Sequence, residues 1–159
     1  MAPPPKPNAV SSPPAPTWPL ILPSVLALAA LYAPQPLLPR WALHYGRPET
    51  DLALVISVAL IPLAVAPLAA GALLRRVPTV SVLRGASVLL GLAVAATAWP
   101  PLFVGLLALR VVQGTAIAAL LTALMTHIAQ TRQGPARQTL MAAYVAATIV
   151  GGFLGRFLS

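Results

Sequence analysis

Five long apolar stretches constrain the fold of this sequence more than any other feature. Each is near the roughly 20 residues that an α-helix needs to cross about 30 Å of hydrocarbon. Short connections separate the stretches and carry helix-breaking residues, such as the run Trp99-Pro100-Pro101. We therefore expect an all-α polytopic transmembrane helix bundle. Its spans are expected at about 18–39, 51–74, 82–99, 101–125 and 139–158.

The composition supports a membrane protein and excludes several classes of function. Of 159 residues, 58% are hydrophobic and 8% are charged, whereas an average soluble domain has about 25% charged residues. There is no cysteine, and His44 and His127 lie in different segments, so no set of metal ligands is apparent in the sequence. A glycine-rich phosphate loop, a nucleophile elbow and paired carboxylates are also missing. We expect neither an enzyme nor a bound cofactor or metal.

The basic residues predict an orientation in the membrane. The net charge of +8 is not arranged as a basic stripe with interleaved aromatic residues, so no nucleic-acid partner is expected. Residues 1–17 are rich in Pro, Ser and Ala, which predicts a disordered cytoplasmic tail. A cytoplasmic N-terminus then places six basic residues on the inner side and three on the outer side, as the positive-inside rule favours. The six are Lys6, Arg75, Arg76, Arg84, Arg132 and Arg137, and the three are Arg40, Arg47 and Arg156.

A permanent positive charge, Arg110, lies near the middle of the fourth stretch. On insertion scales an Arg at a helix centre costs about 2.5–3.5 kcal/mol, and each Leu, Ile, Val or Phe returns about 0.3–0.6 kcal/mol. The apolar residues of 102–125 can therefore carry Arg110 into the membrane. Its side chain can snorkel to the interface, or it can face the bundle interior or an aqueous cavity. Gln113, one turn away on the same face, favours the second interpretation.

The first stretch contains a predicted bend. Pro34 and Pro36 leave backbone carbonyls without their helical donors, and such carbonyls are tolerated at membrane depth only against protein or water. Tyr32 and Gln35 lie at this bend and are candidates for lining a substrate or ion pathway. Tyr32 is equally consistent with an interfacial aromatic residue.

The fifth stretch carries a ridge of small residues. Ala143, Ala147, Gly151 and Gly155 recur every four residues, so they share one face of a helix. Small residues at this spacing let two helix backbones approach closely in a membrane. The ridge therefore predicts helix packing.

Three motifs resemble the major facilitator superfamily of secondary transporters. The fourth helix of that family commonly carries Arg, two residues and then Gln-Gly, and Arg110, Gln113 and Gly114 stand at that spacing. The stretch Met141–Arg156 is similar to the glycine-rich fifth helix of bacterial drug- and sugar-efflux members. The stretch Leu31–Pro39 is similar to the end of the first helix in the arabinose-efflux-like subgroup.

This resemblance covers about residues 18–158 and implies the first five helices of the N-terminal half of a transporter. The complete protein would export an unknown small molecule across the plasma membrane, the inner membrane of a bacterium. Gly114 and the ridge would pack helices, and the resemblance implies that the ridge meets a partner absent from this chain. The expected partners are the lipid bilayer, a small-molecule substrate, and a C-terminal half or another polytopic chain. The five spans alone are expected not to transport.

One family motif departs from its pattern. The loop after the second helix usually reads Gly-x-Leu-x-Asp-Arg-x-Gly-Arg-Arg, and Gly71, Leu73 and Arg76 match it. Arg75 stands at the position of the Asp, and Pro78 stands at the second Gly. The usual attractive gating contact is replaced by a cationic remnant, which still anchors the loop on the inner side.

Two other functions stay open. One is a small membrane interaction subunit, or half of a split transporter. The other is a basic amphipathic protein acting at lipid or nucleic-acid surfaces. The stretch 82–99 argues against the second, because it is apolar on all sides and suits a lipid-facing span.

Overall fold

The computed structural model describes residues 17–99 and 102–157, which form helices and connecting turns without any strand. The expected all-α bundle is confirmed, and five helical stretches in this part of the chain are long and apolar enough to cross a membrane. Of the expected tail, only Thr17 lies within the described residues. The elements are α1 (Trp18–Tyr32), the 3₁₀ helix η1 (Gln35–Leu37), α2 (Leu38–Tyr45), α3 (Glu49–Leu73), α4 (Thr79–Ala96), α5 (Phe103–Thr131) and α6 (Gly134–Phe157).

The first span is broken where the prolines predict a bend. Helix α1 ends at Tyr32, because Pro34 lacks the N–H group that would bond the carbonyl of Ala30. The chain then continues through η1 into α2, so the span reaches Tyr45 rather than about residue 39. Gly46, at a φ of 59°, ends α2 in the left-handed conformation that glycine adopts at low cost.

The connection between the last two helices is shorter than the sequence predicts. Helix α5 continues to Thr131 and α6 begins at Gly134, whereas ends at about 125 and 139 were expected. Gly134 has a φ of 58°, which reverses the chain, and Pro135 stands in the first turn of α6, where its missing N–H is not needed. The polar residues of 131–138 are therefore largely helical.

Two helix pairs pack at backbone contact, α1 with α6 and α3 with α5. The ridge on α6 lies against α1: a Cβ atom built on Gly151 would meet the backbone of Val25, and one on Gly155 would meet that of Ala29. Ala147 on the same face is also buried. The expectation that this ridge awaits a partner outside the chain is therefore wrong for Gly151 and Gly155, because the backbone of α1 already covers them.

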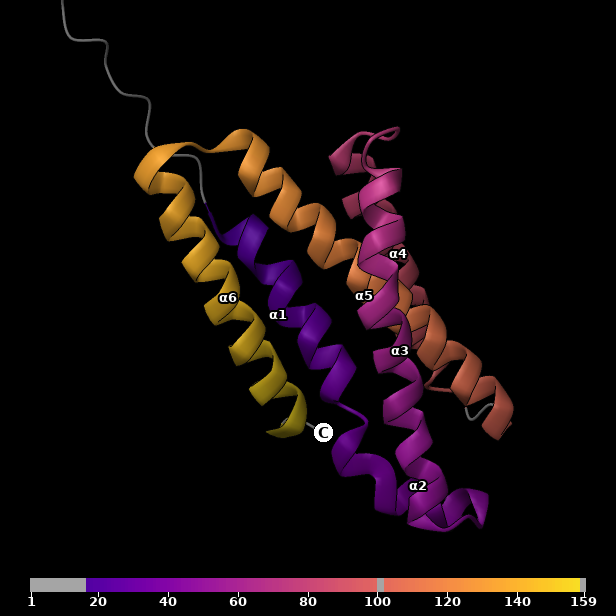
Figure 1. Cartoon of the computed structure of the whole chain (residues 1–159). Coiled ribbons are helices and arrows are strands. Elements are labelled where there is room, and N and C mark those ends of the chain that lie inside the picture. Colours follow the sequence, from indigo (N-terminus) through magenta and orange to yellow (C-terminus); the bar gives the residue numbers. More distant parts are fainter. Residues whose placement is uncertain (1–16, 100–101, 158–159) are drawn as a thin grey trace, which may run out of the picture.

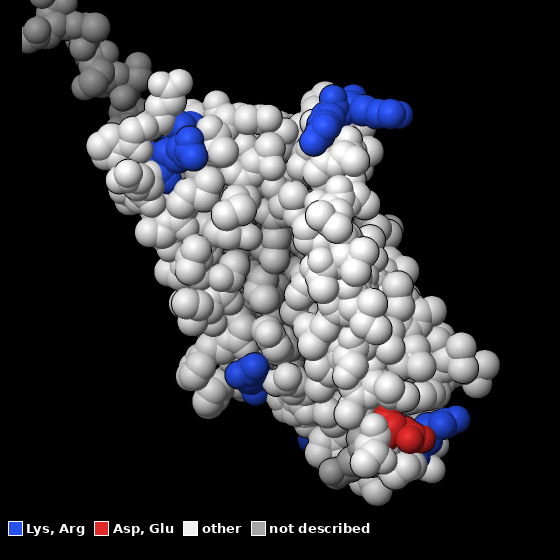
Figure 2. All heavy atoms as spheres, in the orientation of Figure 1, with Lys and Arg blue, Asp and Glu red and all other residues white. Residues whose placement is uncertain are grey.

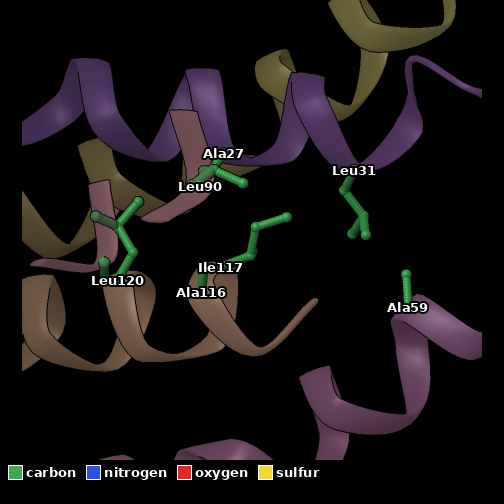
Figure 3. Close-up of a cluster of buried hydrophobic side chains, with 8 residues drawn as sticks. Ala27, Leu31, Ala59, Leu90, Ala116, Ile117 and Leu120 are labelled. Carbon is green, nitrogen blue, oxygen red and sulfur yellow. The ribbon is translucent and has the colours of Figure 1, made fainter. Parts of the chain in front are cut away.

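Helix α5 is the centre of the bundle and contacts α1, α3 and α4 (Figure 1). A buried apolar cluster fills the space between these helices, with Ala27 and Leu31 of α1 facing Ile117 and Leu120 of α5 (Figure 3). The other members are Ala59, Ala86, Leu90 and Ala116.

Helix α4 buries only one face. Its buried residues recur every three or four positions and turn toward α5, while the opposite face is exposed apolar surface. Only one side of this stretch is therefore available to lipid. The sequence could not show which side that is, because the stretch is hydrophobic all round. The buried residues are Thr79, Val82, Ala86, Leu90 and Ala93.

Charged side chains gather at the two ends of the elongated molecule. In Figure 2 the blue Lys and Arg atoms lie at both ends and a broad uncharged band separates them, while red acidic atoms are visible at one end only. Such a band is the surface that a bilayer-spanning bundle presents to lipid.

Candidate functional site

Arg110 is fully buried inside the bundle, with 0% of its surface exposed. It lies on the face of α5 that meets α1 and α3, more than one turn from either end of the helix. The charge therefore faces protein rather than lipid. Gln113, on the same face, is 2% exposed.

The guanidinium group of Arg110 donates hydrogen bonds to three different acceptors. Nη2 donates to the backbone oxygen of Leu31 on α1 at 2.8 Å, and Nε donates to that of Val55 on α3 at 3.1 Å. Nη1 donates to Oε1 of Gln113 at 2.7 Å. The planar fork of arginine suits this arrangement, because its donors point in several fixed directions at once.

Gln113 extends the network to a fourth helix. Its Nε2 donates to the backbone oxygen of Ala93 on α4 at 3.1 Å, while its Oε1 accepts the bond from Arg110. The two side chains, called here the Arg110–Gln113 pair, thus connect α5 to α1, α3 and α4. Every buried side-chain nitrogen and oxygen in the described residues has at least one hydrogen-bond partner, so no nitrogen or oxygen atom of the two side chains is left without a bond.

The position of Leu31 explains part of the stability of this buried charge. Leu31 lies in the last turn of α1, where carbonyl groups lack helical donors and the helix dipole places about half a negative charge. Arg110 therefore satisfies a carbonyl at the end of a broken helix, in a region where an unsatisfied one costs several kcal/mol. No carboxylate takes part: among the described residues, the acids Glu49 and Asp51 lie at the start of α3, and Asp51 pairs with Arg47.

The two other candidate pathway residues lie away from this pair. Tyr32 is partly buried against α6, with the guanidinium carbon of Arg156 4.7 Å from its ring centre and Gly152 beside the ring. Gln35 is partly buried in η1. The structure therefore does not bring Tyr32 and Gln35 together with Arg110, and their role in a pathway stays a prediction.

Gly114 is a point of close packing between α5 and α3. A Cβ atom built there would meet the backbone oxygen of Ala59 and lie 2.8 Å from Cγ of Pro62. The absence of a side chain at 114 thus lets α3 come near enough for Val55 to accept its bond from Arg110.

The gating-loop remnant occupies the turn between α3 and α4. Arg75 and Arg76 are exposed there, and Gly71 in the last turns of α3 has open space around it. Neither Arg75 nor Arg76 is a hydrogen-bond partner of the Arg110–Gln113 pair. They belong to the end of the bundle where Arg84 is also exposed.

Several hollows border the central helices, and two of them lie close to one another. An apolar groove of about 640 Å³ runs between α1 and α4, with Leu22 and Leu26 on one side and Gly91 and Val94 on the other. It is the hollow along the middle of the face in Figure 2. A smaller cavity of about 100 Å³ lies directly beside the Arg110–Gln113 pair. The described residues contain no group of His, Asp or Glu that could hold a metal ion.

Sequence reasoning located Arg110 and Gln113 but missed their partners. The three main acceptors are backbone carbonyls of Leu31, Val55 and Ala93, which no residue type marks. Only the proline break after α1 signalled that carbonyls near the end of that helix would need donors.

Comparison with known proteins agrees with this architecture. No curated protein and no solved structure matches the chain. The sequence profile described as the Major Facilitator Superfamily matches residues 20–159, which include all five apolar helical stretches except the first two residues of α1. This chain, with its five apolar helical stretches, belongs to the major facilitator superfamily, a family of membrane transporters.

Proposed function

We propose that the chain forms the N-terminal part of a secondary transporter that exports small molecules across the bacterial inner membrane, with its N-terminus in the cytoplasm. The buried charge of Arg110 carries the proposal. An ionisable residue inside a membrane bundle is expensive, and it is found chiefly where substrate, ions or conformational change require it. The orientation rests on the six basic residues against three.

The Arg110–Gln113 pair suits a helix bundle that moves as one body. Transporters of this kind expose their substrate site alternately by rocking one half against the other. Bonds from α5 reach α1, α3 and α4, so the pair ties four helices together while the bundle tilts. Arg110 is in this view a positioning residue of the pathway wall, and Gln113 orients its guanidinium group.

We propose that these five spans do not transport alone. A substrate pathway in this family runs between two halves, with the site near the midplane. The apolar groove between α1 and α4 is open along one side, so it offers a wall without a facing wall. A C-terminal half, or another polytopic chain, would supply the missing surface.

A membrane interaction subunit, or half of a split transporter, is the second candidate. The same groove favours it, because a long apolar hollow between two helices can accept a helix from another membrane protein. Under this function the chain would be recovered in a stable complex with a polytopic partner, and the partner would determine the substrate.

Reconstitution separates these possibilities. Purified chain in liposomes is expected to move neither dye nor protons above empty vesicles, under either polarity of a proton gradient. The same chain co-purified with a polytopic partner is expected to export fluorescent cationic or anionic dyes, and Arg110→Ala should abolish that export while Arg84→Ala, at an exposed site, should not. Saturable flux by the chain alone would refute the need for a partner. Export unaffected by Arg110→Ala would refute the role of the buried charge.

A further inference from the structure

Two neighbouring cavities, together called the route here, lie between one end of the bundle and Arg110. The larger, of about 370 Å³, lies between α2, the end of α4 and α5, and Arg40 and His44 line it. The smaller, of about 100 Å³, is the one beside Arg110. Trp41 and Thr97 line both cavities, so these two side chains form the partition between them.

The route is lined by positive and neutral groups. Arg40 is exposed and has no ion pair or hydrogen bond with the described part of the chain. No acidic residue among the described side chains lines either cavity, and Asp51 at the same end is paired with Arg47 at 3.3 Å. A cationic mouth on a cleft raises the local concentration of anions.

Arg110 has donors to spare at the inner end. A guanidinium group carries five N–H donors, and the bonds to Leu31, Val55 and Gln113 use three of them. The remaining donors have no acceptor among the described residues, and the charge has no carboxylate partner there. The helix dipole at Leu31 offsets only about half a unit of charge. A positive group with unused donors, although buried, therefore belongs to the lining of the smaller cavity.

We propose that this cavity binds a singly charged anion, a halide or a carboxylate group, that enters past Arg40 and Trp41. Its volume of about 100 Å³ exceeds the roughly 30 Å³ that one water occupies in the liquid, so a chloride ion or a carboxylate fits. The rest of a carboxylate-bearing molecule would stay in the larger cavity, where Trp41 and Leu106 offer apolar contacts and His44 and Thr97 offer polar ones. This inference rests on the proposed pathway role of Arg110 and names the charge class of what that pathway accepts.

Fluorescence of Trp41 tests the route directly, because this ring separates the two cavities. The full chain in detergent would carry Trp18→Phe and Trp99→Phe, which leaves Trp41 as the only one of the three tryptophans. Iodide, an anionic quencher, is expected to quench Trp41 about threefold more strongly than the cation caesium at equal ionic strength. Part of the iodide effect should be saturable and displaced by chloride or by benzoate.

The two competitors identify the source of the anion. Displacement by benzoate alone indicates a carboxylate-bearing substrate, and displacement by chloride alone indicates an inorganic ion. Equal quenching by iodide and caesium, or iodide quenching that neither competitor reduces, would overturn the proposal.

A matched pair of variants at the mouth excludes a general surface-charge effect. Arg40→Gln is expected to lower iodide quenching about threefold, with quenching by neutral acrylamide unchanged. Arg47→Gln removes an equal charge from the same end of the bundle, where Arg47 pairs with Asp51 and lies over the Phe103 ring, and should leave the iodide effect unchanged. Equal losses in both variants would overturn the route.

The inner site is tested by Arg110→Gln and Arg110→Lys. Both are expected to remove the saturable part of the iodide effect, because neither keeps the two unused guanidinium donors. If neither variant folds, the comparison of Arg40→Gln with Arg47→Gln and the displacement by the two competitors still test the proposal. Binding is measured at equilibrium in detergent and does not depend on transport. Anion binding without transport by a partnered complex would refute the proposed function and leave this site intact. Transport without saturable quenching would refute this site and leave the proposed function intact.

Discussion

Arg110 donates from Nη2 to the backbone oxygen of Leu31, 79 residues earlier in the chain, at a distance of 2.8 Å. Leu31 lies one residue before the end of α1, so the charged group on α5 caps a helix that prolines have broken. The bond thus gives the buried charge an acceptor and gives the carbonyl at the broken helix end a donor, so each group offsets the cost of burying the other. Without the break, Leu31 would have its carbonyl occupied by its own helix and Arg110 would lose an acceptor.

Replacing Arg110 should destabilise the bundle. Arg110→Met keeps most of the volume but removes the bonds to Leu31, Val55 and Gln113. Interhelical hydrogen bonds in membranes average about 0.6 kcal/mol each, and the acceptors left behind add to the loss, so we expect a decrease of about 2 kcal/mol in the free energy of unfolding. Titration with SDS, followed by circular dichroism and tryptophan fluorescence, measures it.

The control for this prediction is Arg84→Met. Arg84 is exposed on α4 and has no part in the network, so its replacement should change the free energy of unfolding by less than about 0.5 kcal/mol. Equal effects of the two substitutions would show that the bonds of Arg110 contribute nothing to the folded bundle.

Replacing Gln113 should loosen α4 in particular. Gln113→Leu removes the bond to Ala93 and leaves one guanidinium nitrogen of Arg110 without its acceptor. We expect a loss of about 1 kcal/mol in the free energy of unfolding. Relative to the parent protein, hydrogen exchange should accelerate more in α4 than in α3. Thr115→Val is the control, because the Thr115 hydroxyl is exposed and bonds only within its own helix, to Val111. Uniform exchange in α3 and α4 would contradict a specific link to α4.

The sequence predicted the helices of this bundle better than their partners. Apolar length located the five spans, and the spacing of Arg110 and Gln113 put both on one face, because helical periodicity is a local property. Which neighbour meets a face is not local. The ridge at Gly151 and Gly155 was assigned to an absent partner, whereas α1 covers it. The carbonyl acceptors escaped notice since every residue carries one.

Topology can be checked with reporter fusions. The bias of basic residues predicts that fusions after residues 78 and 134 report the cytoplasm, and that fusions after 46 and 159 report the outside. Alkaline phosphatase and green fluorescent protein give opposite signals in the two compartments. A cytoplasmic signal at 159 together with one at 134 would mean that α6 does not cross the membrane.

Gly114 should not tolerate even one added methyl group. Gly114→Ala would place Cβ against the backbone oxygen of Ala59, so α3 must shift away from α5. We expect a loss of about 1–3 kcal/mol, as overpacking of a tight contact usually costs. Gly85→Ala is the matched control: nothing lies within 4 Å of the added atom, and alanine favours a helix interior by up to about 1 kcal/mol. A neutral Gly114→Ala would show that the α3–α5 contact is looser than the structure has it.

Because α1 covers the ridge on α6, substitutions in the ridge should destabilise the isolated chain. A ridge that served as a surface for another subunit would predict no such effect. Gly151→Ala would bring Cβ against the backbone of Val25 on α1, and the Cα of Val25 would lie 2.8 Å away. Because the strained contact lies within the chain, the isolated chain itself should lose about 1–3 kcal/mol of unfolding free energy. Gly91→Ala on α4, with open space around the added atom, should lose none. If the ridge instead served another subunit, Gly151→Ala would leave the isolated chain as stable as the parent and weaken only a complex, which co-purification with a polytopic partner would reveal.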